Sequence, residues 1–168
     1  VSYWQMKEAR KELSGTTKIS SYIKHYCYRP FDFRYVFYHK AICERLRTEV
    51  MSHMKQDNIA LLTHRPQSPG DFTFVYCTKM IGDQCVAANK SAGGGNSFQL
   101  PIYVYPTDNQ KTTLFEESTK ERKPNLSPEF IEDFSTRLKM KFIHDGKGDR
   151  KKTFGPEDIF NYMYAVFH

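Results

Sequence analysis

The chain has 168 residues, of which 39% are apolar, so it is long enough to bury the core of one domain. Aromatic residues make up 15% of the sequence, which argues against intrinsic disorder, because disordered chains contain few of them. The formal charge of +6 favours a polyanion as partner but is too small to identify one.

The ends of the chain and its cysteines bear on where the protein works. No apolar run approaches the roughly 20 residues that cross a bilayer, and no signal peptide opens the sequence. The chain starts at Val1 without an initiator Met and stops inside an apolar run, so we expect a fragment of a larger protein. The cysteines form no CxxC pair, and we expect buried, reduced thiols in a cytoplasmic protein. They are Cys27, Cys43, Cys77 and Cys85.

The first third of the chain predicts a helix followed by two strands. Residues 3–13 show helical spacing of Trp4 and two lysines, and Ser14-Gly15 ends the helix. Residues 20–28 alternate with period two and predict a strand, which Arg29-Pro30 breaks because proline lacks an N–H. A second strand over 33–38 is expected to complete a bent antiparallel ribbon.

The middle of the chain predicts one helix and several short strands. Apolar residues spaced i, i+4, i+5 and i+8 predict an amphipathic helix over 44–55. Residues 59–63 predict a buried strand that feeds a loop over 64–70, and 72–78 predict another strand. Residues 80–86 fit either a strand or a short helix.

The glycine-rich run 89–97 predicts a loop, and 98–105 predict a strand that Pro101 and Pro106 push towards a sheet edge or end. Residues 107–127 are polar and predict an exposed connector or insertion.

The last part of the chain predicts two helices. Ser127 is a candidate N-cap with proline at the next position, opening a helix that runs to about residue 142. Residues 145–152 predict a turn rich in glycine and lysine, and 159–167 predict a final apolar helix.

These elements predict an α+β fold with a mixed, largely antiparallel sheet and flanking helices. We expect residues 1–19 to lead in from a preceding domain and residues 20–106 to form the core. Residues 107–127 are the connector, and residues 128–168 are expected to form the helical end of the same domain.

Catalytic motifs are mostly absent from the sequence. It contains no GxxxxGK[ST] phosphate loop, no GxSxG, no HExxH and no GxGxxG fingerprint, and its histidines are scattered singly. Two acid-x-Lys triplets, Asp145-Gly146-Lys147 and Glu121-Arg122-Lys123, have the spacing of metal-dependent nucleases. Such triplets also arise readily by chance in a charged chain, so a small nuclease stays an alternative and no more.

Cationic and amide residues gather at the breaks between apolar runs. Arg reads guanine and Asn or Gln reads adenine through paired hydrogen bonds, while Lys and Arg neutralise phosphates. The alternative is an ordinary solvated surface, and Arg29 or Arg34 could instead pair with Asp32 to hold the turn. By themselves these residues indicate a basic α+β domain with a possible role in DNA binding.

Several stretches stand out in order along the chain. They are Tyr28-Arg29-Pro30-Phe31-Asp32-Phe33-Arg34-Tyr35, Glu49-Val50-Met51-Ser52-His53-Met54, Asn58-Ile59-Ala60-Leu61-Leu62-Thr63 with Arg65 and Gln67, Leu100-Pro101-Ile102-Tyr103-Val104-Tyr105-Pro106, and residues 155–168. Together they resemble the specificity region of single-chain restriction–modification enzymes of type ISP. These enzymes fuse an adenine-N6 methyltransferase to a C-terminal target-recognition domain. Two features depart from the pattern: Pro66 separates Arg65 from Gln67, and 107–127 resemble an insertion.

The resemblance implies a reader of double-stranded DNA sequence whose catalysis lies elsewhere in a parent chain, with no catalytic residue and no metal site here. The chain lacks the Asn-Pro-Pro-Tyr or Asp-Pro-Pro-Tyr motif that holds a flipped adenine, so S-adenosylmethionine is expected only in the parent's methyltransferase domain. Expected partners are DNA and that methyltransferase domain, and no membrane.

This reading predicts which residues touch DNA. The candidates for base edges are Arg65, Gln67, Asn89 and Lys90. The candidates for phosphates are Arg29, Arg34, Lys40, Arg45, Arg47, His64, Lys79 and Ser91. Two other functions stay open: a packing module between larger domains that touches no nucleic acid, and the small nuclease with Asp145 or Glu121.

Overall fold

A computed structural model describes residues 5–64, 75–86, 97–106 and 121–167. The expected loops around 64–70 and 89–97, the start of the 72–78 strand and most of the 107–127 connector lie outside these ranges. Within them the chain has an α+β fold, as predicted, and its strands are divided among four small sheets rather than joined in one.

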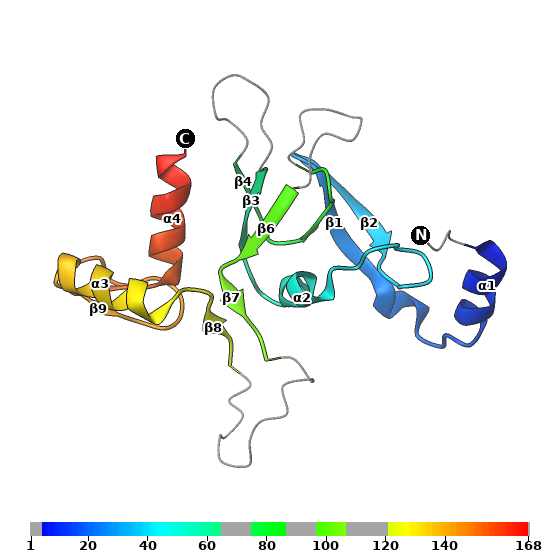
Figure 1. Ribbon diagram of the computed structural model, residues 1–168, viewed down its shortest axis with the longest axis horizontal. Coiled ribbons are helices and arrows are strands. Elements are labelled where there is room, and N and C mark those ends of the chain that lie inside the picture. The colour runs from blue at the N-terminus through cyan, green and yellow to red at the C-terminus, as the bar shows by residue number, and fades with distance from the viewer. Residues whose placement is uncertain (1–4, 65–74, 87–96, 107–120, 168) are drawn as a thin grey trace, which may run out of the picture.

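The N-terminal part consists of a helix and a β-hairpin (Figure 1). Its elements are α1 (Met6–Ser14), the 3-10 helix η1 (Ile19–Tyr22), β1 (Ile23–Arg29) and β2 (Asp32–Phe37). The predicted helix is confirmed, and so is the antiparallel pairing, in which Ile23 lies opposite Phe37 and Cys27 opposite Phe33. The predicted strand starts too early, because residues 20–22 belong to η1.

Two three-stranded sheets form the centre of the molecule. Their remaining strands are β3 (Ala60–His64), β4 (Tyr76–Thr78), β5 (Ile81–Gly82) and β6 (Ser97–Pro101). One sheet has the order β2-β1-β5 with β5 parallel to β1, and the other has the antiparallel order β4-β3-β6. β6 is an edge strand, as the prolines of 98–105 predict. That predicted strand is interrupted at Ile102, whose N–H donates to the Ile59 carbonyl (2.9 Å), before β7 (Tyr103–Val104) begins.

The predicted helix over 44–55 is wrong at its start, over 44–47, and is broken into two short pieces after that. Only α2 (Thr48–Met51) and the 3-10 helix η2 (His53–Lys55) are helical. Residues 44–47 are irregular, because Arg47 has a left-handed φ of 45° and the Tyr38 hydroxyl donates to the Leu46 carbonyl. Tertiary contacts therefore override the helical spacing of the apolar residues.

The C-terminal part is built on α3 (Pro128–Leu138), β9 (Lys141–Phe142), β10 (Thr153–Phe154) and α4 (Pro156–Val166). The predicted N-cap is confirmed: the Ser127 hydroxyl accepts a hydrogen bond from the Phe130 N–H at 3.2 Å. The helix ends earlier than predicted, since Lys139 is left-handed (φ 54°). The end of the predicted connector is also wrong, because β8 (Lys123–Pro124) pairs with β7.

Small cores join these parts. Tyr38, Met51 and Ile81 pack beneath the hairpin, and Phe142, Phe154 and Ile159 form the C-terminal core. Between them, a core that contains Leu61, Tyr103 and Phe160 seats α4 against the central sheet, which lies between α4 and the hairpin in Figure 1.

The prediction that the cysteines are buried thiols holds only in part. All four cysteines are free thiols, but only Cys27 is buried and Cys77 is exposed, so the prediction of buried thiols holds for one of them. Among the described residues, the helices are too short or too polar to cross a membrane.

Candidate nucleic-acid interface

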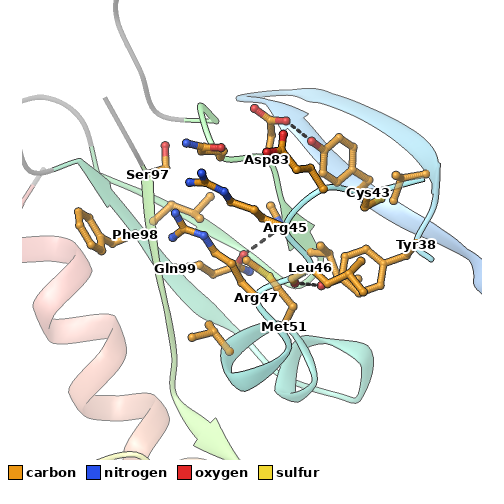
Figure 2. Close-up of a pocket in the computed structure, with 18 of the residues that line it drawn as sticks. Tyr38, Cys43, Arg45, Leu46, Arg47, Met51, Asp83, Ser97, Phe98 and Gln99 are labelled. Atoms are coloured by element: carbon orange, nitrogen blue, oxygen red, sulfur yellow. Dashed lines mark hydrogen bonds between the residues drawn. The ribbon is translucent and has the colours of Figure 1, made fainter. Parts of the chain in front are cut away.

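A pocket of about 600 Å³ lies where the hairpin sheet meets β6 (Figure 2). Its wall on one side is the segment 43–47, and β6 forms the opposite side. Figure 2 shows the side chains of Arg45 and Arg47 running from this segment towards Ser97 and Gln99. We call this the arginine pocket.

Leu46 anchors the backbone segment that carries the two arginines. Its side chain packs against the core beneath the hairpin, and its carbonyl accepts a hydrogen bond from the Tyr38 hydroxyl. Burial raises the pKa of Tyr38 to about 12, so this hydroxyl stays protonated and remains a donor at neutral pH. Because Leu46 points into the core, its neighbours Arg45 and Arg47 are left exposed.

The charge of the two guanidinium groups bears on what the pocket can bind. Among the described residues, neither Arg45 nor Arg47 forms an ion pair, although Asp83 and Glu44 also line the pocket. Phe98 and Leu100, which are 40% and 49% exposed, add apolar surface to the same pocket. A guanidinium suits a phosphate oxygen, and apolar carbon suits a sugar or a base methyl group.

In β6 the polar side chains are buried and the apolar side chains are exposed, which is the reverse of the usual pattern in a strand. The residues of β6 form one side of the arginine pocket. Ser97 and Gln99 are buried, each 7% exposed, while the apolar Phe98 and Leu100 face outward. The Gln99 amide nitrogen donates to the Met80 carbonyl (2.7 Å), and its amide oxygen accepts from the Gly82 N–H (2.9 Å). Gln99 therefore fastens one three-stranded sheet to the other.

The arginine pocket reaches one end of the β4-β3-β6 sheet. His64 at the end of β3 pairs in register with Ser97, and the Ser97 N–H donates to the Gln84 carbonyl at 2.7 Å. Ser97 and Gln84 both line the pocket. In the sequence, His64 directly precedes the range 65–74 and Ser97 directly follows the range 87–96.

A family model, that of the type ISP C-terminal specificity domain, matches residues 1–168, which is the whole chain. The chain belongs to this family. No curated protein and no solved structure matches it. The specificity domain serves target recognition in a restriction–modification enzyme and is a non-catalytic module of that enzyme.

The specificity domain's predicted base contacts all fall outside the described residues. Arg65 and Gln67 lie in the range 65–74, and Asn89, Lys90 and the phosphate candidate Ser91 lie in 87–96. Their roles stay predictions.

The other phosphate candidates are dispersed. Arg29 pairs with Asp83 at 3.0 Å, Arg34 pairs with Asp32 at 2.7 Å, and Lys40 pairs with Glu12 at 2.9 Å. The alternative that one arginine holds the turn through Asp32 is thus confirmed for Arg34, whereas Arg29 has a different partner.

The remaining two candidates do not line the arginine pocket. Lys79 is exposed beside a second, smaller pocket that Arg122 also lines. His64 is only 3% exposed on β3, a placement that suits packing better than a phosphate contact.

The carboxylates of the nuclease alternative are engaged or scattered. Asp145 pairs with Arg122 at 2.7 Å. In the described ranges, no group of three His, Cys, Asp or Glu is arranged to hold a metal ion.

Sequence reasoning missed Gln99 and Arg122 as structural residues. Arg122 stacks on the Tyr103 ring (3.9 Å from the guanidinium carbon to the centroid) and donates to the Asp57 carbonyl at 2.8 Å. A polar residue flanked by apolar neighbours in the strand Ser97–Pro101 was the available signal for Gln99. No local pattern marks Arg122, because its partners lie far away in the sequence.

Proposed function

We propose that this specificity domain reads a double-stranded DNA sequence and positions the methyltransferase and nuclease of its parent restriction–modification enzyme on that site. The observation that carries the proposal is the arginine pocket, which presents two arginines that have no carboxylate partner in the part of the chain that the structure describes. Ser97, which directly follows one range of predicted base contacts, lines this pocket, and His64, which directly precedes the other, is the partner of Ser97 in register.

The proposal divides the work between charge and sequence reading. Arg45 and Arg47 bind phosphates and thereby fix the register of the domain on the duplex. Arg65, Gln67, Asn89 and Lys90 then meet base edges in the major groove. Arg29 and Arg34 are engaged by carboxylates, but a guanidinium has five N–H donors, so each keeps some for a phosphate.

Catalysis belongs to other domains of the parent in this proposal. The parent is an adenine-N6 methyltransferase, and its methyltransferase domain binds S-adenosylmethionine. The specificity domain contributes by holding the duplex so that one adenine can be flipped into the methyltransferase pocket.

The test is the salt dependence of DNA binding by the parent enzyme, measured by fluorescence anisotropy on a labelled duplex. Replacing Arg45→Gln and Arg47→Gln together is expected to reduce the slope of log K against log salt by about two, because about one counterion is released per phosphate contact. The control is Arg137→Gln, since Arg137 is exposed on α3 and pairs with Asp133. An unchanged slope in the double variant would remove the arginine pocket from the interface.

A packing module without DNA contact is favoured by one observation only. Apolar side chains on the outer side of the hairpin and on α4 are exposed, among them Tyr35 at 71% and Val166 at 66%. If the folded parent enzyme carrying the double variant bound DNA with full affinity and specificity, this second function would be preferred.

A further inference from the structure

The tip of the β1–β2 hairpin carries an aromatic side chain that the fold does not use. The strands are joined by Pro30 and Phe31, and Phe31 is 89% exposed. Phe31 also has a positive φ of 65°, a left-handed conformation that costs free energy in a residue other than glycine. An apolar ring stabilises a fold only when it is buried, so neither the backbone conformation nor the exposed ring of Phe31 stabilises this protein.

The tip is nevertheless rigidly built. The guanidinium groups of Arg29 and Arg34 lie over the Tyr28 ring, at 4.1 Å and 4.0 Å from its centroid. Arg34 also grips Asp32 through two nitrogens, at 2.7 Å and 3.0 Å. Proline fixes its own φ at the turn. Phe31 is therefore held out from a preorganised support.

The hairpin tip stands clear of the rest of the sheet. In the described chain only Tyr26 and Cys27 of β1 pair with β5, so the end beyond Cys27 is a two-stranded ribbon. A ribbon of two strands fits into a groove of B-DNA, and proteins insert apolar side chains between base pairs from such positions.

The tip is also joined to the proposed interface. Arg29 pairs with Asp83, which lines the arginine pocket. In Figure 1 the tip lies on the same, upper side of the molecule as the end of β3 and the start of β6. Arg29 and Arg34 at the base of the tip are each paired with a carboxylate but retain N–H donors, so the tip can still donate hydrogen bonds to phosphate oxygens.

We propose that Phe31 is a wedge that inserts between two base pairs of the bound duplex, next to the recognised sequence, and unstacks that step. The inference rests on the proposed function, because the occupant of the tip is the same DNA. Unstacking one step bends the duplex and brings more of it against the protein.

The experiment uses the parent enzyme and duplexes that contain its recognised sequence, with 2-aminopurine placed at one position at a time across the site and its flanks. An unstacked 2-aminopurine fluoresces more strongly. The wild type is expected to raise the signal at one step besides the flipped adenine. Phe31→Ala should abolish that rise and weaken binding about tenfold, the scale of one base–aromatic stack.

Two further variants separate the wedge from a general loss of surface. Phe31→Leu keeps an apolar wedge and should retain most of the signal. Tyr35→Ala removes another exposed ring from the same hairpin, 71% exposed, and should leave the signal unchanged. Because both side chains are exposed, neither change should unfold the hairpin.

The possible failures are distinguishable. A wild-type enzyme that binds no duplex specifically overturns the proposed function and the wedge together. Specific binding with no unstacked step outside the flipped adenine, or a rise that survives Phe31→Ala, overturns the wedge alone. Altered association of the enzyme's own domains in Phe31→Ala without DNA would show that the tip meets protein, and would also overturn it.

Discussion

At the scale of single residues, Gln99 carries the joint between the two three-stranded sheets. Its two amide atoms use their hydrogen bonds on β5 and the residue before it, in a site that is almost closed to solvent. A Cβ at Gly82 would lie 2.9 Å from the Gln99 amide oxygen, so a larger residue at this position would displace the Gln99 side chain. Gln99 also lines the arginine pocket, so one side chain contributes both to the stability of the fold and to the shape of the pocket.

Gln99→Ala is expected to lower the free energy of unfolding by about 2–4 kcal/mol. The change leaves the Met80 carbonyl and the Gly82 N–H without partners and opens a cavity. Urea denaturation followed by circular dichroism measures it. Leu100→Ala, at the next and half-exposed position, should cost less than about 1 kcal/mol. Equal losses in the two variants would contradict this account of the joint.

At the scale of elements, Arg122 connects the β7–β8 sheet to the turn that precedes β10. Its side chain is 20% exposed, stacks on the buried Tyr103 and reaches Asp145 on the other side. Tyr103 strengthens the same link, since its hydroxyl accepts from the Gly146 N–H at 2.8 Å. These contacts attach the C-terminal helices to the sheet from a position predicted to be an exposed connector.

Arg122→Met should destabilise the chain by about 2 kcal/mol, because it removes the cation–π contact and a hydrogen bond to the Asp57 carbonyl. The ion pairs themselves contribute little, since Asp57 and Asp145 are largely exposed. The matched variant is Arg137→Met, whose arginine is 75% exposed and should cost less than about 0.5 kcal/mol. Thermal or urea unfolding of both variants decides whether Arg122 is a joint or ordinary surface.

The turn before α4 should make the chain sensitive to acid. Hydrogen bonds from the N–H groups of Lys151, Lys152 and Thr153 lower the pKa of Asp149. Burial raises the pKa of Asp158, but N–H donors from Gly148 and Gly155 outweigh it, and the net shift is downward. A carboxylate with a lowered pKa in the folded state stabilises the fold above its unfolded pKa of about 4, and that stabilisation is lost as the pH falls.

The check is the urea midpoint of the wild type and of Asp149→Asn between about pH 3 and 7, the range over which an unfolded Asp titrates. The wild type should be the more stable at neutral pH, and the difference should shrink below about pH 4, because Asp149 then becomes protonated in the unfolded chain while the fold still holds it ionised. A difference that stays constant across the range would mean that the charge of Asp149 does not hold this turn.

The sequence predicted those elements that are determined by a few neighbouring residues. The hairpin follows from alternation broken at Pro30, and the start of α3 follows from Ser127 beside a proline. The helix predicted over 44–55 was wrong over 44–47, because the left-handed Arg47 and the bond from Tyr38 to Leu46 depend on tertiary packing. The arginine pocket could not be predicted for the same reason, although both of its arginines were among the phosphate candidates.

At the scale of the whole molecule, the basic side chains differ in whether a carboxylate pairs with them. The chain carries a net +6, yet several of its basic side chains are matched by carboxylates, as Arg29, Arg34 and Lys40 are. Arg45 and Arg47 remain unmatched among the described residues, and they lie in the same pocket. The location of the unpaired arginines, more than the net charge of the chain, therefore supports our proposal that this face of the specificity domain binds DNA.

The most direct test of that account is selection from a pool of randomised duplexes, with binding followed by anisotropy at about 50 and 200 mM salt, the range in which phosphate contacts show. The 168-residue chain and the enzyme that carries it are compared side by side. We predict salt-sensitive binding by both and enrichment of the same short sequence. A folded chain that binds no duplex at either salt, or binds all sequences equally, would contradict the claim that this domain reads DNA.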